Sequence, residues 1–126
     1  MCFKISLKLP SLNEYTASCR AHAQKGASLK RDTEYMICWD IQRAISAKQL
    51  RQCSAPIRLA FEWHERTKKR DADNIAFAKK FILDALVKMR IIVDDGRKYV
   101  KGFTDEIIDD KADFVIVKIF EEGEQK

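Results

Sequence analysis

The sequence predicts a single-domain α+β fold in which helices pack on a mixed β-sheet. Some stretches alternate apolar and polar residues as a half-buried strand does, and others repeat apolar residues with the period of a helix. The chain has 126 residues, of which 46% are hydrophobic, and this suits one compact domain with a modest core. We expect the elements in the order β-α-β-α-β-β, with residues 1–126 forming one domain.

In the N-terminal half, a strand is expected over residues 3–9, where apolar side chains alternate with lysine and serine before a proline. Residues 11–27 show no sustained period, so we expect a long loop of the kind that often carries function. Helical spacing then predicts a helix from about residue 28 to about residue 50, with Ser28 or Asp32 as its N-cap.

In the C-terminal half, alternation predicts three further strands, over residues 57–65, 98–104 and 113–121. A helix is expected between the first two, from about Asn74 to Met89, with Asp73 capping its exposed N–H groups. The tail after residue 121 is expected to fray.

Charge favours a polyanionic partner. The chain has 24 Lys and Arg against 19 Asp and Glu, a net charge of +5, and a pI near 9.1. Its apolar runs are far shorter than a bilayer span, and its start lacks the pattern of a signal peptide. We therefore expect a cytoplasmic protein without a membrane partner.

Cysteine and histidine give little support to a metal site of their own. The four cysteines lie at irregular spacing without a Cys-x-x-Cys pair, so they are expected to be reduced thiols. Only two histidines exist, His22 and His64, which disfavours a His-rich metal site or a mechanism that needs several histidines.

Four aspartates form two close pairs within this cationic chain, Asp71 with Asp73 and Asp94 with Asp95. Two carboxylates one residue apart, in an extended segment before a helix, can share a hard divalent cation such as Mg²⁺. The structural alternatives are ordinary. Asp73 can be a helix cap beside a loop acid, and Asp-Gly at residues 95–96 can be a turn.

Helical spacing adds a lysine to the first pair. Lys80 and Asp84 follow Asp73 by seven and eleven residues, close to two and three turns, so one continuous helix would carry all three on one face. A lysine there could contact a phosphate or position a water. The alternative is a solvated lysine paired with Asp84 four residues later.

Together, "LKLPSLNEY", "KRDADN", "KKFILDALVK" and "IIVDDGRKY" resemble the RusA family of Holliday junction resolvases, small endodeoxyribonucleases common in prophages. The resemblance runs from about residue 3 to residue 120. It implies that Asp71, Asp73 and Asp95 are catalytic carboxylates that bind Mg²⁺, with Asp94 as a fourth metal ligand. Mn²⁺ is a possible substitute, and no nucleotide cofactor is implied.

The family pattern also contains a catalytic lysine, one helical turn after the second aspartate. This chain has Phe77 at that place, with lysines at Lys79 and Lys80. Alignment on the "DAL" that begins at Asp84 selects Lys80 and implies an insertion of about one turn. Lys79 would point about a hundred degrees away.

The resemblance implies Mg²⁺-dependent resolution of four-way DNA junctions by paired symmetric nicks, in recombination and repair, by a homodimer. The residues expected to contact DNA phosphates are Arg66, Lys68, Lys69, Arg70, Arg97, Lys98 and Lys101. Those expected to read junction shape, from the loop at 11–27, are Asn13, Tyr15, Arg20 and Lys25.

Three alternatives stay open. Asp109 to Lys111 form an Asp-x-Lys that resembles the end of a restriction-type nuclease motif, with Asp95 upstream. The same residues would serve a metal-dependent nuclease of flaps or forks. A non-catalytic prophage DNA-binding module could keep the fold alone.

Overall fold

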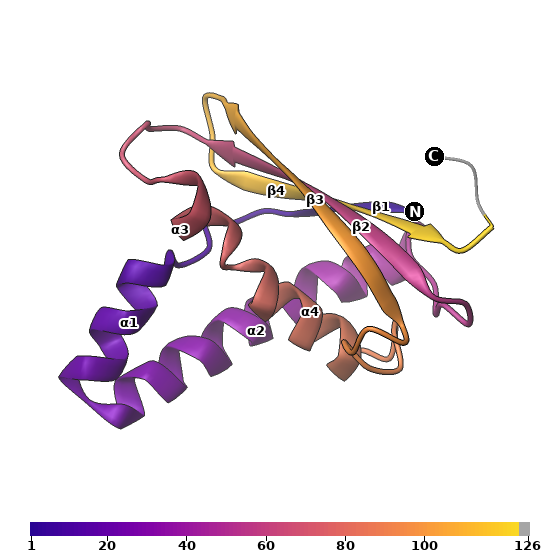
Figure 1. Ribbon diagram of the computed structural model, residues 1–126, viewed down its shortest axis with the longest axis horizontal. Helices are drawn as coiled ribbons and strands as arrows, with labels where there is room; N and C mark the ends of the chain where they lie inside the picture. The colour runs from indigo at the N-terminus through magenta and orange to yellow at the C-terminus, as the bar shows by residue number, and fades with distance from the viewer. Residues whose placement is uncertain (124–126) are drawn as a thin grey trace.

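The computed structural model describes residues 1–123 and confirms an α+β domain with a mixed four-stranded sheet (Figure 1). The elements are β1 (Cys2–Ile5), α1 (Leu12–Ala21), α2 (Ala23–Ser46), β2 (Ile57–Glu65), α3 (Ala72–Ala76), α4 (Lys79–Lys88), β3 (Val100–Asp109) and β4 (Phe114–Glu121). The strands follow the predicted order. The first predicted helix corresponds to α2, the second is divided into α3 and α4, and α1 lies where a loop was expected. The predicted fraying of the tail concerns residues that lie largely outside the described part.

The sheet order is β1-β4-β2-β3. β4 pairs antiparallel with both β1 and β2, whereas β2 and β3 are parallel. Parallel neighbours need a crossover connection, and residues 66–99 supply it with α3 and α4. This crossover carries both aspartate pairs, so its path decides whether they meet.

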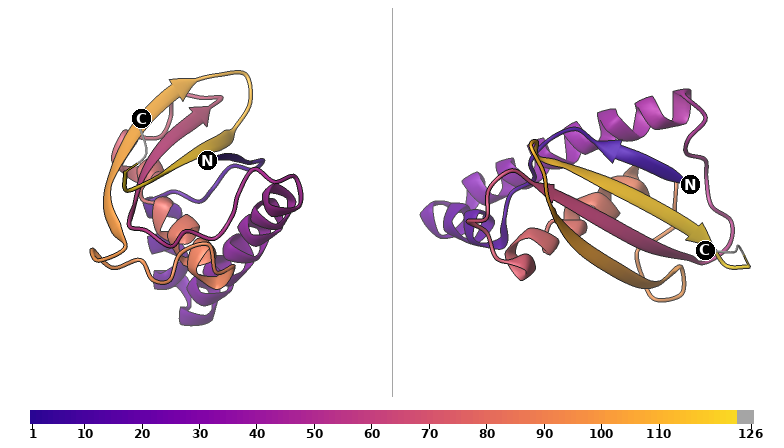
Figure 2. Two further views of the ribbon diagram at one scale, coloured as in Figure 1. Left: turned by 90° about the vertical axis from the view of Figure 1, so that its right-hand side faces the viewer. Right: turned by 90° about the horizontal axis from the view of Figure 1, so that it is seen from above.

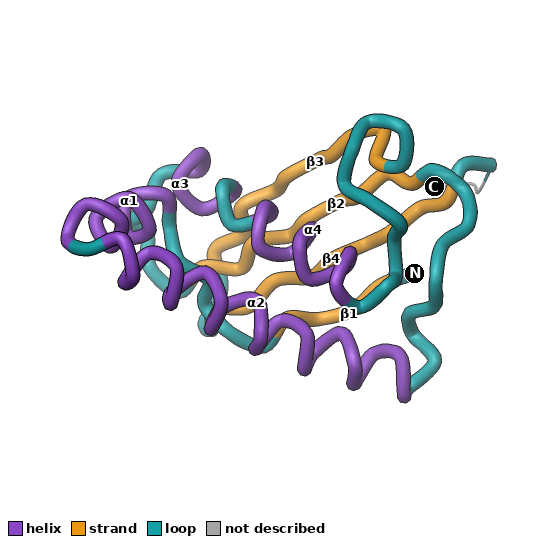
Figure 3. Tube along the Cα trace, turned by 90° about the horizontal axis from the view of Figure 1, so that it is seen from below, coloured by secondary structure: helices purple, strands orange, loops and turns teal. Residues whose placement is uncertain are grey.

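The core lies between the sheet and the helices. Leu59, Phe61 and Trp63 of β2 face it from the sheet, and Ile37 of α2 and Phe81 of α4 face it from the helices, each at most 2% exposed. Full burial of such side chains contributes about 1.5–3 kcal/mol each. The helices α2 and α4 lie side by side across one face of the sheet, and the other face has no described helix on it (Figures 2 and 3).

The predicted loop over residues 11–27 is wrong, because this segment is helical. Ser11 and Glu14 form a capping box, in which the Ser11 hydroxyl accepts from the Glu14 N–H and the Glu14 carboxylate accepts from the Ser11 N–H. Every residue of α1 is exposed or half-buried, so no apolar stripe marks the helix in the sequence.

The caps and end points of two neighbouring elements also differ from the prediction. The N-cap of α2 is His22, whose Nδ1 accepts from the Gln24 N–H, rather than Ser28 or Asp32. The first strand ends at Ile5 instead of residue 9, because the next N–H, that of Ser6, donates to the carboxylate of Asp40 on α2.

The predicted continuous helix from Asn74 to Met89 is broken. α3 ends at Ala76 and α4 begins at Lys79, with a turn between them. The N-cap of α3 is Asp71, whose side chain makes no capping hydrogen bond, and Asp73 lies in the first turn, where its carboxylate accepts from the Asn74 N–H. β3 begins close to the predicted residue 98 and runs on to Asp109, because it pairs with β2 along its length.

Candidate active-site groove

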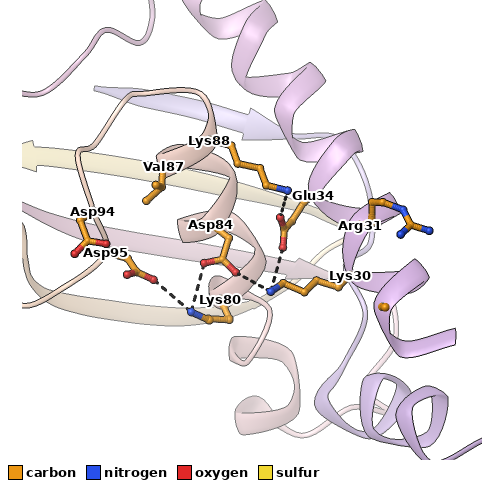
Figure 4. Close-up of a pocket in the computed structure, with 10 residues that line it drawn as sticks. Lys30, Arg31, Glu34, Lys80, Asp84, Val87, Lys88, Asp94 and Asp95 are labelled. Carbon is orange, nitrogen blue, oxygen red and sulfur yellow. Dashed lines mark hydrogen bonds and ion pairs between the residues drawn. The ribbon is translucent and has the colours of Figure 1, made fainter. Parts of the chain in front are cut away.

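A groove of about 640 Å³ lies between α2, α4 and the loop that follows α4 (Figure 4). Its walls are Ala27, Lys30, Arg31 and Glu34 from α2, Lys80, Asp84, Val87 and Lys88 from α4, and Asp94 and Asp95 from the loop. Four acids and four bases therefore face one open hollow. Such a hollow suits a charged ligand better than an apolar one.

Lys80 lies at the centre of this charge network. Its Nζ is 3.3 Å from Asp95 Oδ2 and 3.4 Å from Asp84 Oδ1. Asp84 lies one helical turn after Lys80 on the same face of α4. The chain turns after α4, and this places Asp95 beside Lys80. The charge of Asp84, together with the hydrogen bonds that Lys80 donates to both carboxylates, raises the pKa of Lys80. Lys80 therefore stays protonated at neutral pH, and it can supply positive charge but is a poor general base.

Glu34 extends the network from α2. The residue is 2% exposed, and its Oε1 accepts from Lys88 Nζ at 2.7 Å, which raises the pKa of Lys88. Its Oε2 is 3.9 Å from Lys30 Nζ and lacks a hydrogen-bond partner within residues 1–123. Lys30 also lies 3.6 Å from Asp84, so the charges alternate in sign from Asp95 on the loop to Lys88, as the dashed lines in Figure 4 show.

Sequence reasoning missed Glu34 and Lys30. Both lie in α2, far along the chain from the aspartate motifs. One signal was present: Glu34 precedes Ile37 by three residues and Ile41 by seven, so it is a carboxylate on the apolar face of a helix. An acid in that position is seldom buried without a partner.

The first aspartate pair does not join the groove. Asp71 and Asp73 are exposed on α3, and neither contributes to the groove wall. The break between α3 and α4 explains this, because residues of two separate helices do not keep the common face that one helix would give them.

The aspartates of the two pairs do not form a Mg²⁺ site in this structure. A hard divalent cation takes six or more oxygen ligands, several of them carboxylates. Within residues 1–123, no three or more His, Cys, Asp or Glu side chains lie close enough together to hold a metal ion. In this conformation, the set of Asp71, Asp73, Asp94 and Asp95 therefore does not fit the metal that the sequence pattern implies.

Most of the residues predicted to contact DNA are exposed. The exposed ones are Asn13, Arg20, Lys25, Arg66, Lys68, Lys69, Arg97, Lys98 and Lys101. Arg70 differs, because its guanidinium makes two hydrogen bonds to Glu65, at 2.9 and 2.8 Å, and a third to the Leu9 carbonyl. Its side chain is 13% exposed, so Arg70 ties the crossover to β2 and is poorly placed to bind DNA.

Lys79, the other candidate for the catalytic lysine, faces a different environment. It pairs with Asp105 of β3 and lies over the rings of Phe103 and Phe61. Lys79 thus joins α4 to the sheet edge and does not line the groove. Of the two lysines, only Lys80 contacts Asp95.

The Asp-x-Lys at Asp109 to Lys111 lies at the far end of β3 from Asp95. Asp109 is the last residue of β3, and Asp95 precedes its first residue. A strand of ten residues spans roughly 30 Å, so Asp95 cannot complete that motif within one chain. Asp110 instead accepts from the Lys111 N–H and from His64, and these two hydrogen bonds lower the pKa of Asp110.

No known family model matches the chain, and no curated protein matches it. All four cysteines are free thiols, as expected. Within the described residues, the helices are too short or too polar to cross a membrane.

Proposed function

We propose that the protein is an endodeoxyribonuclease that cuts branched DNA, with the four-way junction as its preferred substrate. The observation that supports this most strongly is the position of Lys80, protonated and held between Asp84 and Asp95 in an open groove. The RusA-like motif assigns both Lys80 and an acid of the second pair to catalysis, and the two residues meet although they are fifteen positions apart.

In this proposal, the cations of the groove bind the phosphate and the carboxylates position Lys80. A backbone phosphate that enters the groove finds Lys30, Arg31, Lys80 and Lys88 as donors. Lys80 then stabilises the negative charge that develops on the phosphate oxygens during cleavage. The carboxylates of Asp84 and Asp95 hold its ammonium in place beforehand, so that little reorganisation is needed.

The proposal includes dependence on Mg²⁺, with Mn²⁺ as a substitute. This part rests on the sequence pattern alone. Because the acids of this conformation do not fit the ion, no catalytic step is assigned to it. The dependence is open to a direct check by adding either metal to the chelated protein.

Resolution of a junction needs two matched nicks, and a C2 dimer provides two identical sites. We therefore propose a homodimer that acts in DNA recombination and repair. A cytoplasmic location and a prophage origin are part of the same proposal.

A non-catalytic DNA-binding module is the second candidate. It is favoured by one observation, the separation of Asp71 and Asp73 from the groove. A groove that binds phosphates with Lys30, Lys80 and Lys88 would serve such a module without any cleavage.

The test is a cleavage assay on end-labelled four-way junctions, flaps, forks and linear duplex, each with Mg²⁺ or with EDTA. The proposal predicts paired symmetric nicks in the junction with Mg²⁺ and none with EDTA. Equal cutting of linear duplex would refute branch selectivity. Binding without cleavage under any divalent metal would establish the module instead.

A further inference from the structure

The outer face of α2 exposes three large apolar side chains within five residues. Tyr35 is 63% exposed, Met36 51% and Trp39 54%, and the rings of Tyr35 and Trp39 meet edge to face with centroids 6.2 Å apart. Grouped exposure of this kind marks a binding surface more often than chance.

A shallow hollow of about 200 Å³ lies against these rings. Tyr35, Cys38, Trp39 and Gln42 form one wall from α2, and Met89, just after α4, forms the other. The hollow offers an aromatic face and a thioether, and its lining is apolar. A flat ring suits this lining, because it can stack on the aromatic face.

The hollow adjoins the groove directly. Glu34 and Lys88 line the groove, while the next residues along the chain, Tyr35 and Met89, line the hollow. The ion pair between Glu34 and Lys88, at 2.7 Å, therefore forms the wall between them. A ligand with a phosphate in the groove could place an attached ring in the hollow.

The surrounding charge favours a polyanion. The exposed charged residues of this surface, within about a turn of the hollow, are Arg31, Asp32, Arg43, Lys88 and Arg90. Four of the five are cations, of which Arg43 and Lys88 pair with the buried Asp40 and Glu34, so Arg31 and Arg90 supply most of the positive charge. Aromatic rings beside cations are typical of single-strand nucleic-acid surfaces, where bases stack and phosphates pair with lysine or arginine. A purely apolar partner would have no use for these cations.

We propose that Tyr35 and Trp39 stack against unpaired bases of a DNA strand whose backbone lies in the adjacent groove. The inference deepens the proposed function, on which it rests for the DNA in the groove. It narrows the proposed substrate to branched DNA in which some bases are unpaired and can turn out of the DNA helix. Base stacking of this kind tolerates any sequence, because every base has a π face.

Tryptophan fluorescence tests the proposal without any cleavage. The chain has two tryptophans, and Trp63 is 2% exposed with its indole N–H bonded to Asp105, so a change in emission reports Trp39. The protein is titrated with oligodeoxythymidylate in EDTA, with anisotropy of the same labelled strand as a second measure of binding. We expect the strand to quench the emission, blunt duplex to quench it far less, and Trp39→Phe to abolish the signal.

Two variants measure how much Trp39 contributes to the affinity for the single strand. Trp39→Ala should weaken binding of the single strand by roughly 5- to 150-fold, as the loss of one stacked base does. Met36→Ala is the matched control, because Met36 is equally exposed on α2 but does not line the hollow, and it should bind as the wild type does.

Three results would overturn the inference. Binding by anisotropy without quenching would show that DNA occupies the groove alone, which leaves the proposed function intact. Absence of binding to single strands and junctions alike would remove both proposals. Emission that changes with protein concentration, and not with DNA, would show that a second copy covers these rings.

Discussion

Substitution of Lys80 by methionine separates a catalytic role from a structural one. The change keeps the aliphatic stem and removes the ammonium between Asp84 and Asp95. Because the side chain is 57% exposed, its two ion pairs are screened by water and contribute about 0.2–1 kcal/mol each. Loss of about 1 kcal/mol leaves a domain of ordinary stability folded.

The expected effect on cleavage is much larger. Loss of a group that stabilises transition-state charge typically lowers the rate by about 10²–10³-fold, or about 2.7–4 kcal/mol. Urea unfolding and single-turnover cleavage of a four-way junction, measured on the same preparation, give the two numbers. The prediction is a small shift in unfolding with a loss of cleavage of at least about a hundredfold.

Lys79→Met is the matched control. It removes the same charge from the adjacent residue, which pairs with Asp105 away from the groove. We expect a larger loss of stability than for Lys80→Met, because Lys79 is less exposed and lies over two aromatic rings, with cleavage near the wild-type rate. If Lys79→Met slows cleavage as much as Lys80→Met, net charge explains the loss and the assignment of Lys80 is wrong.

Of three further predictions, the first rests on the sequence pattern, because Asp73 lies outside the groove, and the other two rest on the groove. Asp73→Asn should abolish cleavage while junction binding by gel shift stays close to wild type, and cleavage at the wild-type rate would remove Asp73 from the catalytic set. Glu34→Gln should weaken junction binding about fivefold, or about 1 kcal/mol, because Lys30 and Lys88 lose the charge that holds them; unchanged binding would show that Glu34 serves the fold alone. The raised pKa of Lys80 predicts that its stabilising contribution, measured as the difference in unfolding free energy between wild type and Lys80→Met, is constant from about pH 6 to 9 and is lost only as the pH rises through that pKa. A difference that shrinks already near neutral pH would contradict the charge state assigned to Lys80.

The fold class could be predicted because the strands alternate clearly. β2 and β4 were predicted nearly to the residue, since each faces the core on one side and solvent on the other. α1 could not, because it buries no apolar stripe and its signal was a capping box at Ser11. An apolar stripe along a helix and a capping box at its start are separate signals, and α1 carries only the capping box.

The break at Phe77 and Ala78 is the main difference at the site. Helical periodicity placed Asp73, Lys80 and Asp84 on one face, which held for Lys80 and Asp84 within α4 and failed for Asp73 across the turn. Ala, Phe and Lys are all compatible with a helix, so local propensity gives no warning of the break.

The resemblance assigned catalytic roles to both Lys80 and Asp95, and the structure brings the two side chains into contact. Nothing in the spacing of these two residues requires them to meet, because a turn of variable geometry lies between them. Glu34 is the opposite case, since its burial is visible only once α2 and α4 are packed together.

The central claim is that the groove around Lys80 and Asp95 is where DNA is cut. The most direct measurement is the cleavage rate of a four-way junction by Asp95→Asn beside Asp109→Asn, with binding of each variant measured in parallel. The account predicts that Asp95→Asn binds the junction without cutting it and that Asp109→Asn cuts at the wild-type rate. Cleavage that survives Asp95→Asn and is lost in Asp109→Asn would place the chemistry at the other end of β3 and contradict it.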